Sequence, residues 1–311
     1  MNANTMQPTP RAALRLLNRQ RLLLQLLRAL GGHSTKLDFQ KLLFLWCNDE
    51  QADAPQYEFV PYRFGAFSFT SYADRRKLID CGLLVDDEHS WSLRVEGREV
   101  ADVALDDRLS SFVQRYQSLR GDRLVAETYR RFPYYATRSE IAERVLVGDQ
   151  PALERVAEAR KPKQTSSLST IGYEGKTLER FLNTLLTRGV TLLCDVRRNA
   201  LSRKYGFSKG TLSRGCDGVG IRYEHLPQLG IASEQRHALN TQADYDALFA
   251  EYRRTWLPTQ SDTLQTVSDW INGGERVALM CYEHLPQQCH RHCVADALVA
   301  RFKADFSPTH L

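Results

Sequence analysis

Apolar residues in the first half of the chain recur every three or four positions, which is the spacing of a helix face. Helices are predicted over residues 14–30, 35–46 and 69–81. The first ends at Gly31-Gly32, and the second begins at a capping Ser34 or Thr35. A hairpin is predicted over residues 82–95, and residues 105–147 return to helical spacing. Helices followed by a hairpin indicate a winged-helix-like order.

The second half alternates short apolar runs with helical patterns. Strands are predicted over residues 168–173, 190–196, 221–226 and 277–282, and helices over residues 177–187, 245–256, 263–271 and 294–302. Such alternation predicts an α/β fold with a three-layer, mostly parallel sheet.

A weakly patterned segment separates the two halves. Between residues 148 and 169 the apolar spacing fades, and residues 160–167 are polar apart from Pro162. We place a linker there. Residues 1–150 are predicted to form a mainly helical, winged-helix-like domain, and residues 168–311 an α/β domain that is the candidate catalytic domain.

Composition limits the possible partners and the compartment. The 311 residues carry a net charge of +5, which permits a polyanionic partner. No apolar run approaches the roughly 18–20 residues that span a bilayer, so no membrane partner is expected. The N-terminus lacks the pattern of a secretory signal, and the seven cysteines are odd in number and scattered. We therefore expect free thiols and a reducing cytoplasm.

Chemistry-bearing residues follow two predicted strands. In parallel sheets the carboxyl ends of strands share one edge, and ligands bind there. Asp195 ends the second strand, where a carboxylate is costly unless it meets a cation, a metal or a substrate. Arg197 and Arg198 are close enough in sequence to pair with it. A structural ion pair or a helix cap is the alternative to a catalytic carboxylate.

The segment after Asp195 has the composition of a phosphate-binding loop. Ser202, Arg203 and Lys204 combine a hydroxyl with two cations, which suits phosphate oxygens. Tyr205 could stack on a base, as could Tyr173 at the end of the first strand. A solvated basic loop is the alternative.

Residues 281–293 hold three cysteines, three histidines, Glu283 and Arg291, and they allow several interpretations. Zinc could bind Cys281, Cys289, Cys293 and one of His284, His290 or His292, although the spacing lacks paired C-x-x-C motifs. A thiol at the helix start could be nucleophilic. In the interpretation that we favour, Glu283 supplies acid–base chemistry while His290 and Arg291 bind an anionic group. The cysteines could also be packed as small hydrophobes. We expect no cofactor, with zinc as the alternative.

The first half contains cations that could contact DNA. They are Lys36, Lys41, Arg63, Arg75, Arg76 and Lys77. Acidic residues are interspersed among them, so a winged helix that contacts protein, including a second copy of the chain, is the alternative partner.

Ordered motifs in the second half resemble a known family. They are Thr170-Ile-Gly-Tyr173, Cys194-Asp-Val-Arg197 with Ser202-Arg-Lys204, His225-Leu-Pro with Leu229-Gly230, and Cys281-x-Glu283 with Cys289-His-Arg291. Together they resemble the family called domain of unknown function four-eight-eight over residues 168–302. The first half resembles, more distantly, winged-helix modules of bacterial defence and regulatory proteins, through residues 39–44, 62–68 and 81–84. The resemblance implies a prokaryotic protein that acts on nucleic acids.

These observations favour a nucleic-acid-directed enzyme with DNA as partner, most concretely a base-excising N-glycosidase in bacterial defence. Asp195 or Glu283 would activate water or stabilise an oxocarbenium-like centre. Arg197, Arg203, Lys204 and Arg291 would hold phosphates, and an extruded base would stack on Tyr173 or Tyr205. A phosphodiesterase would use many of the same residues. A non-enzymatic DNA-binding regulator with a nucleotide-like ligand pocket is the alternative.

Overall fold

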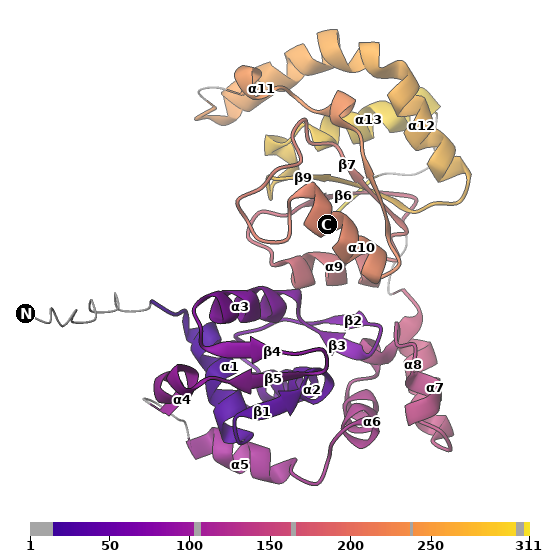
Figure 1. Ribbon diagram of the computed structural model, residues 1–311. Coiled ribbons are helices and arrows are strands. Elements are labelled where there is room, and N and C mark those ends of the chain that lie inside the picture. Colours follow the sequence, from indigo (N-terminus) through magenta and orange to yellow (C-terminus); the bar gives the residue numbers. More distant parts are fainter. Residues whose placement is uncertain (1–14, 103–106, 163–165, 237–238, 303–307) are drawn as a thin grey trace, which may run out of the picture.

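The computed structural model describes residues 15–102, 107–162, 166–236, 239–302 and 308–311 (Figure 1). The expected helical residues Leu14 and 105–106 lie outside these ranges. We call residues 15–160 the N-terminal region and residues 166–311 the C-terminal region. No helix in the described ranges combines the length and the hydropathy that a bilayer span requires.

The N-terminal region is mainly helical and has a winged-helix-like order, as predicted. Its helices are α1 (Asn18–Ala29), α2 (Lys36–Asp49), α3 (Phe69–Asp80), α4 (Val95–Asp102), α5 (Asp107–Arg115), α6 (Asp122–Arg131), α7 (Ala142–Val145) and α8 (Gln150–Arg160). Its strands are β1 (His33–Thr35), β2 (Val60–Tyr62), β3 (Gly65–Phe67), β4 (Leu84–Asp86) and β5 (Ser90–Leu93). Strands β1, β5 and β4 form an antiparallel sheet in that order, and β2–β3 is a separate hairpin between α2 and α3.

Several boundaries differ from the prediction. Helix α1 begins at Asn18 because Leu17 is extended and its N–H donates to Gln20 Oε1 at 3.0 Å. Strand β1 was not expected. The linker is shorter than predicted, because residues 150–160 form α8, which Asp149 caps and which buries Ala152 and Val156 in a cluster with α6.

The C-terminal region contains one parallel sheet with helices on both faces, which confirms the predicted α/β architecture. Its strands are β6 (Leu168–Gly172), β7 (Leu192–Asp195), β8 (Arg222–His225), β9 (Val277–Cys281) and β10 (Thr309–His310), arranged in the order β10-β6-β9-β7-β8. Its helices are α9 (Leu178–Thr187), α10 (Lys209–Gly218), α11 (Gln242–Glu251), α12 (Ser261–Asn272) and α13 (Arg291–Phe302). The two-residue β10 adds a fifth strand to the four that the sequence predicted.

Two hydrophobic clusters lie between the sheet and its two layers of helices. Helices α9 and α10 pack on one face of the sheet, where Ile171, Leu193 and Met280 point. Helices α11, α12 and α13 pack on the other face, over Leu192 and Leu279. Figure 1 shows α9 and α10 between the sheet and the N-terminal region, with α11 to α13 on the far side.

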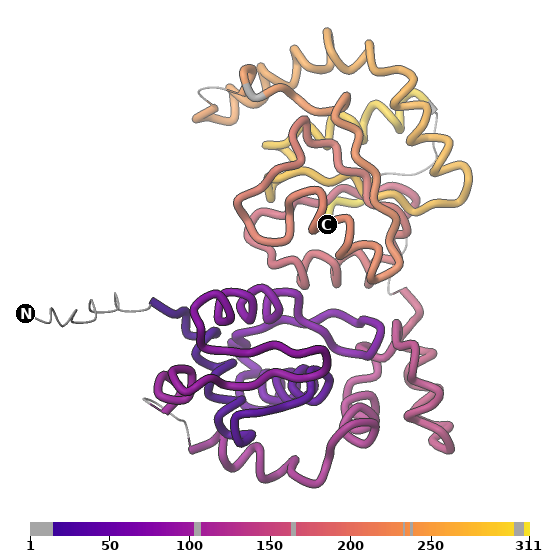
Figure 2. Tube along the Cα trace, viewed as in Figure 1, coloured from indigo at the N-terminus to yellow at the C-terminus, as the bar shows by residue number. Residues whose placement is uncertain are grey.

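Helix α9 contacts the N-terminal region, where its neighbours are α3 and β2 (Figure 2). The Glu179 side chain on α9 is fully buried and accepts hydrogen bonds from the Thr70 N–H (2.8 Å), the Thr70 hydroxyl (3.0 Å) and the Ser68 hydroxyl (3.1 Å). A carboxylate at a helix N-terminus satisfies unpaired N–H groups and complements the helix dipole. A residue of the C-terminal region therefore caps the start of α3.

Candidate functional site

The carboxyl ends of four strands, β6 to β9, lie along one edge of the parallel sheet. Neighbouring strands β6 and β9 are followed by helices on opposite faces, α9 and α13. In open α/β sheets a ligand crevice forms where such a reversal occurs. The predicted site residues on these strand ends therefore stand at the expected place in the fold.

The structure separates the two candidate carboxylates. Asp195 follows Leu193 by two residues and pairs with Met280, and both of these side chains face α9 and α10. Cys281 faces the other layer, and Glu283 Oε2 lies 3.5 Å from its Sγ. Because strand residues alternate between faces, Asp195 and Glu283 belong to opposite sides of the sheet edge.

Asp195 is enclosed by donors. The side chain is fully buried, and Arg197 donates to it from the backbone N–H, from Nε (2.8 Å) and from Nη2 (2.6 Å). The Tyr223 hydroxyl donates at 2.6 Å, and burial together with the Asp195 charge raises the pKa of that phenol, which keeps it a donor. A carboxylate with these partners orients Arg197 and has little access to water.

Arg197 extends this network to Tyr173. Its Nη1 donates to the Tyr173 hydroxyl at 3.0 Å, and its guanidinium lies 5.1 Å from the centre of that ring. The Tyr173 ring in turn stacks on Phe207 at 4.3 Å. Both Tyr173 and Arg197 are buried, so the geometry gives them a positioning role at this edge.

In the basic loop after β7, some side chains are exposed to solvent and others are hydrogen-bonded within the protein. Arg198 and Arg203 are exposed, and Arg198 Nη1 reaches the Pro227 carbonyl at 3.4 Å. Lys204 Nζ donates to the Tyr173 carbonyl at 3.1 Å, and Ser202 Oγ accepts from the Lys204 N–H. Tyr205 donates to the Phe69 carbonyl at 3.0 Å, so its hydroxyl contacts the N-terminal region, although the residue stays 46% exposed.

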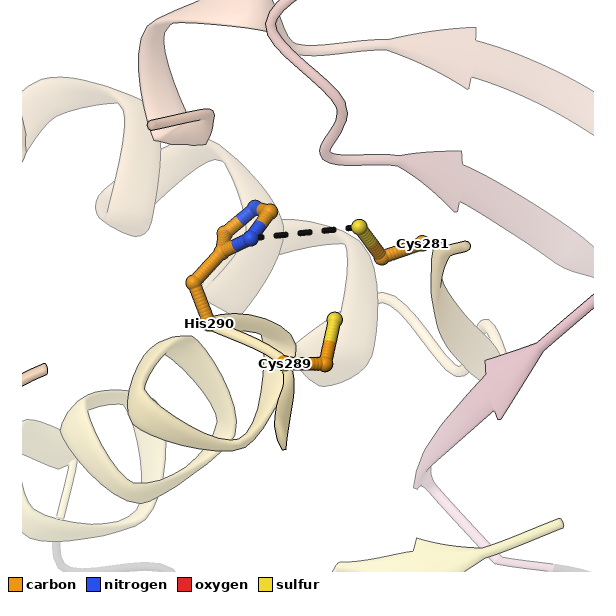
Figure 3. A group of neighbouring side chains, drawn as sticks. All are labelled: Cys281, Cys289 and His290. Carbon is orange, nitrogen blue, oxygen red and sulfur yellow. Dashed lines mark hydrogen bonds between the residues drawn. The ribbon is translucent and has the colours of Figure 1, made fainter. Parts of the chain in front are cut away.

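A second cluster lies on the α13 side. Cys281, Cys289 and His290 are buried, and their ligand atoms all lie within 4.8 Å of one another. Figure 3 shows the three side chains converging from the end of β9 and the start of α13. All seven cysteines are free thiols, and burial raises the pKa of Cys289 well above its usual value. That direction opposes a nucleophilic role for Cys289 at neutral pH.

His290 has a defined orientation. Its Nε2 lies 3.0 Å from the Val196 carbonyl, an acceptor, so the neutral ring carries its hydrogen on Nε2. Its Nδ1 lone pair therefore points at Cys281 Sγ, 3.8 Å away. This nitrogen can accept a proton or bind a metal.

Glu283 is paired with Arg236. The Arg236 guanidinium forms an ion pair with Glu283 Oε1, while Oε2 faces the Cys281 thiol. Burial alone raises the pKa of Glu283, but the Arg236 charge and the contact with Cys289 outweigh it and leave the pKa below its usual value. The arrangement presents an ionised carboxylate beside an imidazole and two thiols.

Arg291 holds the loop that carries Glu283. The buried guanidinium donates to the Glu283 carbonyl (2.6 Å) and the His284 carbonyl (3.0 Å). Gly172 lets this loop pass the end of β6, because a Cβ at that position would come 1.9 Å from the Glu283 carbonyl oxygen. Arg291 was predicted to bind an anion, whereas these contacts make it a positioning residue.

Arg236 and Tyr223 were missed from the sequence. Tyr223 has a recoverable signal, since it lies on a predicted strand that ends beside Asp195. Arg236 has none, because it lies in a loop 47 residues from its partner Glu283.

Residues 177–298 match the family model described as domain of unknown function DUF488. The match confirms the resemblance of the C-terminal half, and it includes both clusters except Tyr173. No curated protein matches the chain. The family description names no reaction.

Proposed function

We propose that this protein is a nucleic-acid-directed hydrolase, most concretely a base-excising DNA N-glycosidase, whose reacting carboxylate is Glu283. The observation that carries the proposal is the Glu283–Arg236 pair at the strand edge that usually binds ligands. Exposed groups of the kinds that bind nucleic acid border this edge: the Tyr282 ring, 44% exposed, and the cations Arg198 and Arg203.

In this reaction the bond between the sugar C1′ and the base nitrogen breaks. The sugar develops positive charge, which an adjacent carboxylate stabilises, and water adds to C1′ as the base leaves with a proton. Glu283 can accept the proton of the attacking water, while Tyr282 offers a face for an extruded base. Arg198 and Arg203 would contact the flanking phosphates.

Asp195 has a supporting part in this proposal. It fixes Arg197, and Arg197 fixes the Tyr173 ring that lies 5.2 Å from the Tyr282 ring. In this proposal the reacting carboxylate, Glu283, lies on the α13 side of the sheet edge, and the Asp195 network supports the Tyr173 ring that borders Tyr282.

The contact of Glu179 with the N-terminus of α3 favours the enzyme over a DNA-binding regulator. Helix α3 directly precedes the β4–β5 hairpin, which is the position of the recognition helix in a winged-helix order. In helix-turn-helix proteins the N-terminal residues of the recognition helix contact base edges. Glu179 occupies the N-terminus of α3, so this end is not available to DNA in the observed arrangement. We therefore propose that the winged-helix-like unit contacts protein. The proposal includes a role in bacterial defence and a location in a reducing cytoplasm, which suits the free thiols.

The test is turnover by the full chain. Single-stranded and duplex DNA with normal and modified bases would be incubated with the protein, and released base would be measured by mass spectrometry. Glu283→Gln should lower the rate by at least about 10²-fold, the usual contribution of a general base. Glu224→Gln is the matched control, because that carboxylate lies on β8 and is 43% exposed.

Tight DNA binding by the wild-type chain without product from any substrate would contradict the enzyme proposal and favour the regulator. Equal rates in Glu283→Gln and Glu224→Gln would show that Glu283 is not the reacting group.

A further inference from the structure

We propose that Cys281, Cys289 and His290 bind a zinc ion. Two thiol sulfurs and an imidazole nitrogen lie within 4.8 Å of one another, each from a buried residue. These are the ligand types that zinc prefers, and they come from two segments that the fold holds together, the end of β9 and the start of α13 (Figure 3).

The spacing of the cluster fits tetrahedral coordination. With zinc–sulfur and zinc–nitrogen bonds of about 2.3 and 2.0 Å, a tetrahedral site places a sulfur and a nitrogen ligand about 3.5 Å apart and two sulfur ligands about 3.8 Å apart. Cys281 Sγ lies 3.8 Å from His290 Nδ1. A movement of a few tenths of an ångström would bring these two ligands to bonding geometry.

The ring nitrogen of His290 that points away from the sulfurs, Nε2, makes the hydrogen bond that zinc-bound histidines usually make. A metal-bound histidine donates its second ring N–H to a carbonyl or a carboxylate, which fixes the ring and the tautomer. His290 Nε2 makes this contact with the Val196 carbonyl at 3.0 Å, and Nδ1 is left facing the sulfurs. The imidazole is therefore oriented for a metal before any metal binds.

This ligand set corrects the zinc site that the sequence suggested. Cys293 does not belong to the cluster, since its Sγ contacts the His292 ring, 3.5 Å from Nε2. The described residues thus supply three close ligands from this segment, one fewer than structural zinc sites use. Three protein ligands are typical of catalytic centres, which leave the fourth position to water.

Glu283 stands beside this centre, with Oε2 at 3.5 Å from Cys281 Sγ. A zinc-bound water would be available to the hydrolysis proposed above, and this last step alone rests on that proposed function. Metal binding itself does not depend on the substrate or on turnover.

The experiment is a metal titration of the full chain. Protein that has been reduced and stripped with a chelator would be titrated with Zn²⁺, and separately with Co²⁺ as a spectroscopic probe. We expect about one metal ion per chain, with the sulfur-to-cobalt absorption of thiolate ligation. Cys289→Ser and His290→Ala should weaken binding by at least about tenfold, whereas Cys293→Ser, which alters a buried thiol in the first turn of α13, should bind as the wild type does.

Circular dichroism of each variant shows whether it is folded, so that weaker metal binding caused by a missing ligand can be told apart from weaker binding caused by unfolding. A reduced wild-type chain that takes up no zinc or cobalt would overturn the inference, as would a Cys281–Cys289 disulfide in freshly purified protein. Equal weakening by Cys293→Ser would also overturn it. Metal binding without DNA turnover would leave the zinc site standing and would contradict only the hydrolase.

Discussion

At the scale of single residues, the buried ion pair of Asp195 and Arg197 governs the stability of the strand edge. Removing one charge of a buried pair leaves the other without compensation, at a cost of about 3–5 kcal/mol. We predict this loss in the free energy of unfolding for Asp195→Asn, measured by urea denaturation. Tyr223→Phe removes one hydrogen bond to the same carboxylate and should cost about 1 kcal/mol. Equal losses in both variants would contradict the ion-pair account.

Lys41 supplies a prediction about pH. This lysine of α2 is buried, its Nζ donates to the Ala66 carbonyl at 2.9 Å, and burial lowers the pKa to about 7 from an ordinary 10.5. Between these values the unfolded chain binds more protons than the folded chain. The free energy of unfolding should therefore rise with pH in this window, by up to about 1.4 kcal/mol per pH unit.

Lys41→Met keeps the length of the side chain and removes the titrating group. Denaturation at a series of pH values should show a flatter profile for this variant above pH 7. Parallel profiles for the two proteins would mean that Lys41 titrates normally in the folded chain.

The sequence predicts a site residue where that residue stands at or shortly after the end of a recognisable strand. Asp195, Glu283 and His290 were identified because they follow apolar runs that end at one edge of the sheet. The face on which each side chain lies was not predictable, because it depends on which helices cover which face. The position of Arg236 beside Glu283 depends on a contact between residues 47 positions apart in the sequence, and no periodic pattern predicts such a contact.

At the scale of elements, the capping of α3 by Glu179 connects the two regions. Glu179→Ala would leave the Thr70 N–H without its acceptor, at a cost of about 1–3 kcal/mol. We predict faster hydrogen exchange in the first turn of α3. Thr70→Val is the matched control, since it loses the hydroxyl contact and keeps the backbone hydrogen bond, so exchange there should change less. Unchanged exchange in Glu179→Ala would show that α3 does not need this cap.

The strands with apolar runs were predicted, whereas the short strands β1 and β10 and the helices α4, α8 and α10 were not. Strand β9 is a continuous apolar run, and β7 is one up to Asp195, whereas β6 also contains Ser169 and Thr170. All three are buried on both faces, which makes apolar runs of this kind visible in a sequence. Strand β10 has two residues and β1 has three, too few for any periodicity. Helix α8 lies in the predicted linker because few of its residues are buried, and Ala152 and Val156 alone give little periodic pattern.

At the scale of the whole molecule, two surfaces compete as the nucleic-acid interface. One is the sheet edge with Arg198 and Arg203, and the other is the exposed part of α3 with Arg76 and Lys77. The docking of α9 on α3 favours the sheet edge, because it covers the end of α3 that a winged helix would insert into DNA.

Salt dependence distinguishes these surfaces. Each phosphate contact contributes about one unit to the slope of log affinity against log salt concentration. Arg198→Ala with Arg203→Ala should therefore reduce the slope by about two and weaken binding to all sequences alike, as measured by fluorescence anisotropy. Arg76→Ala with Lys77→Ala removes the same charge from α3 and should leave the slope unchanged. If only the α3 variant changes the slope, the winged-helix-like unit binds the nucleic acid, and the two regions must separate before α3 can reach it.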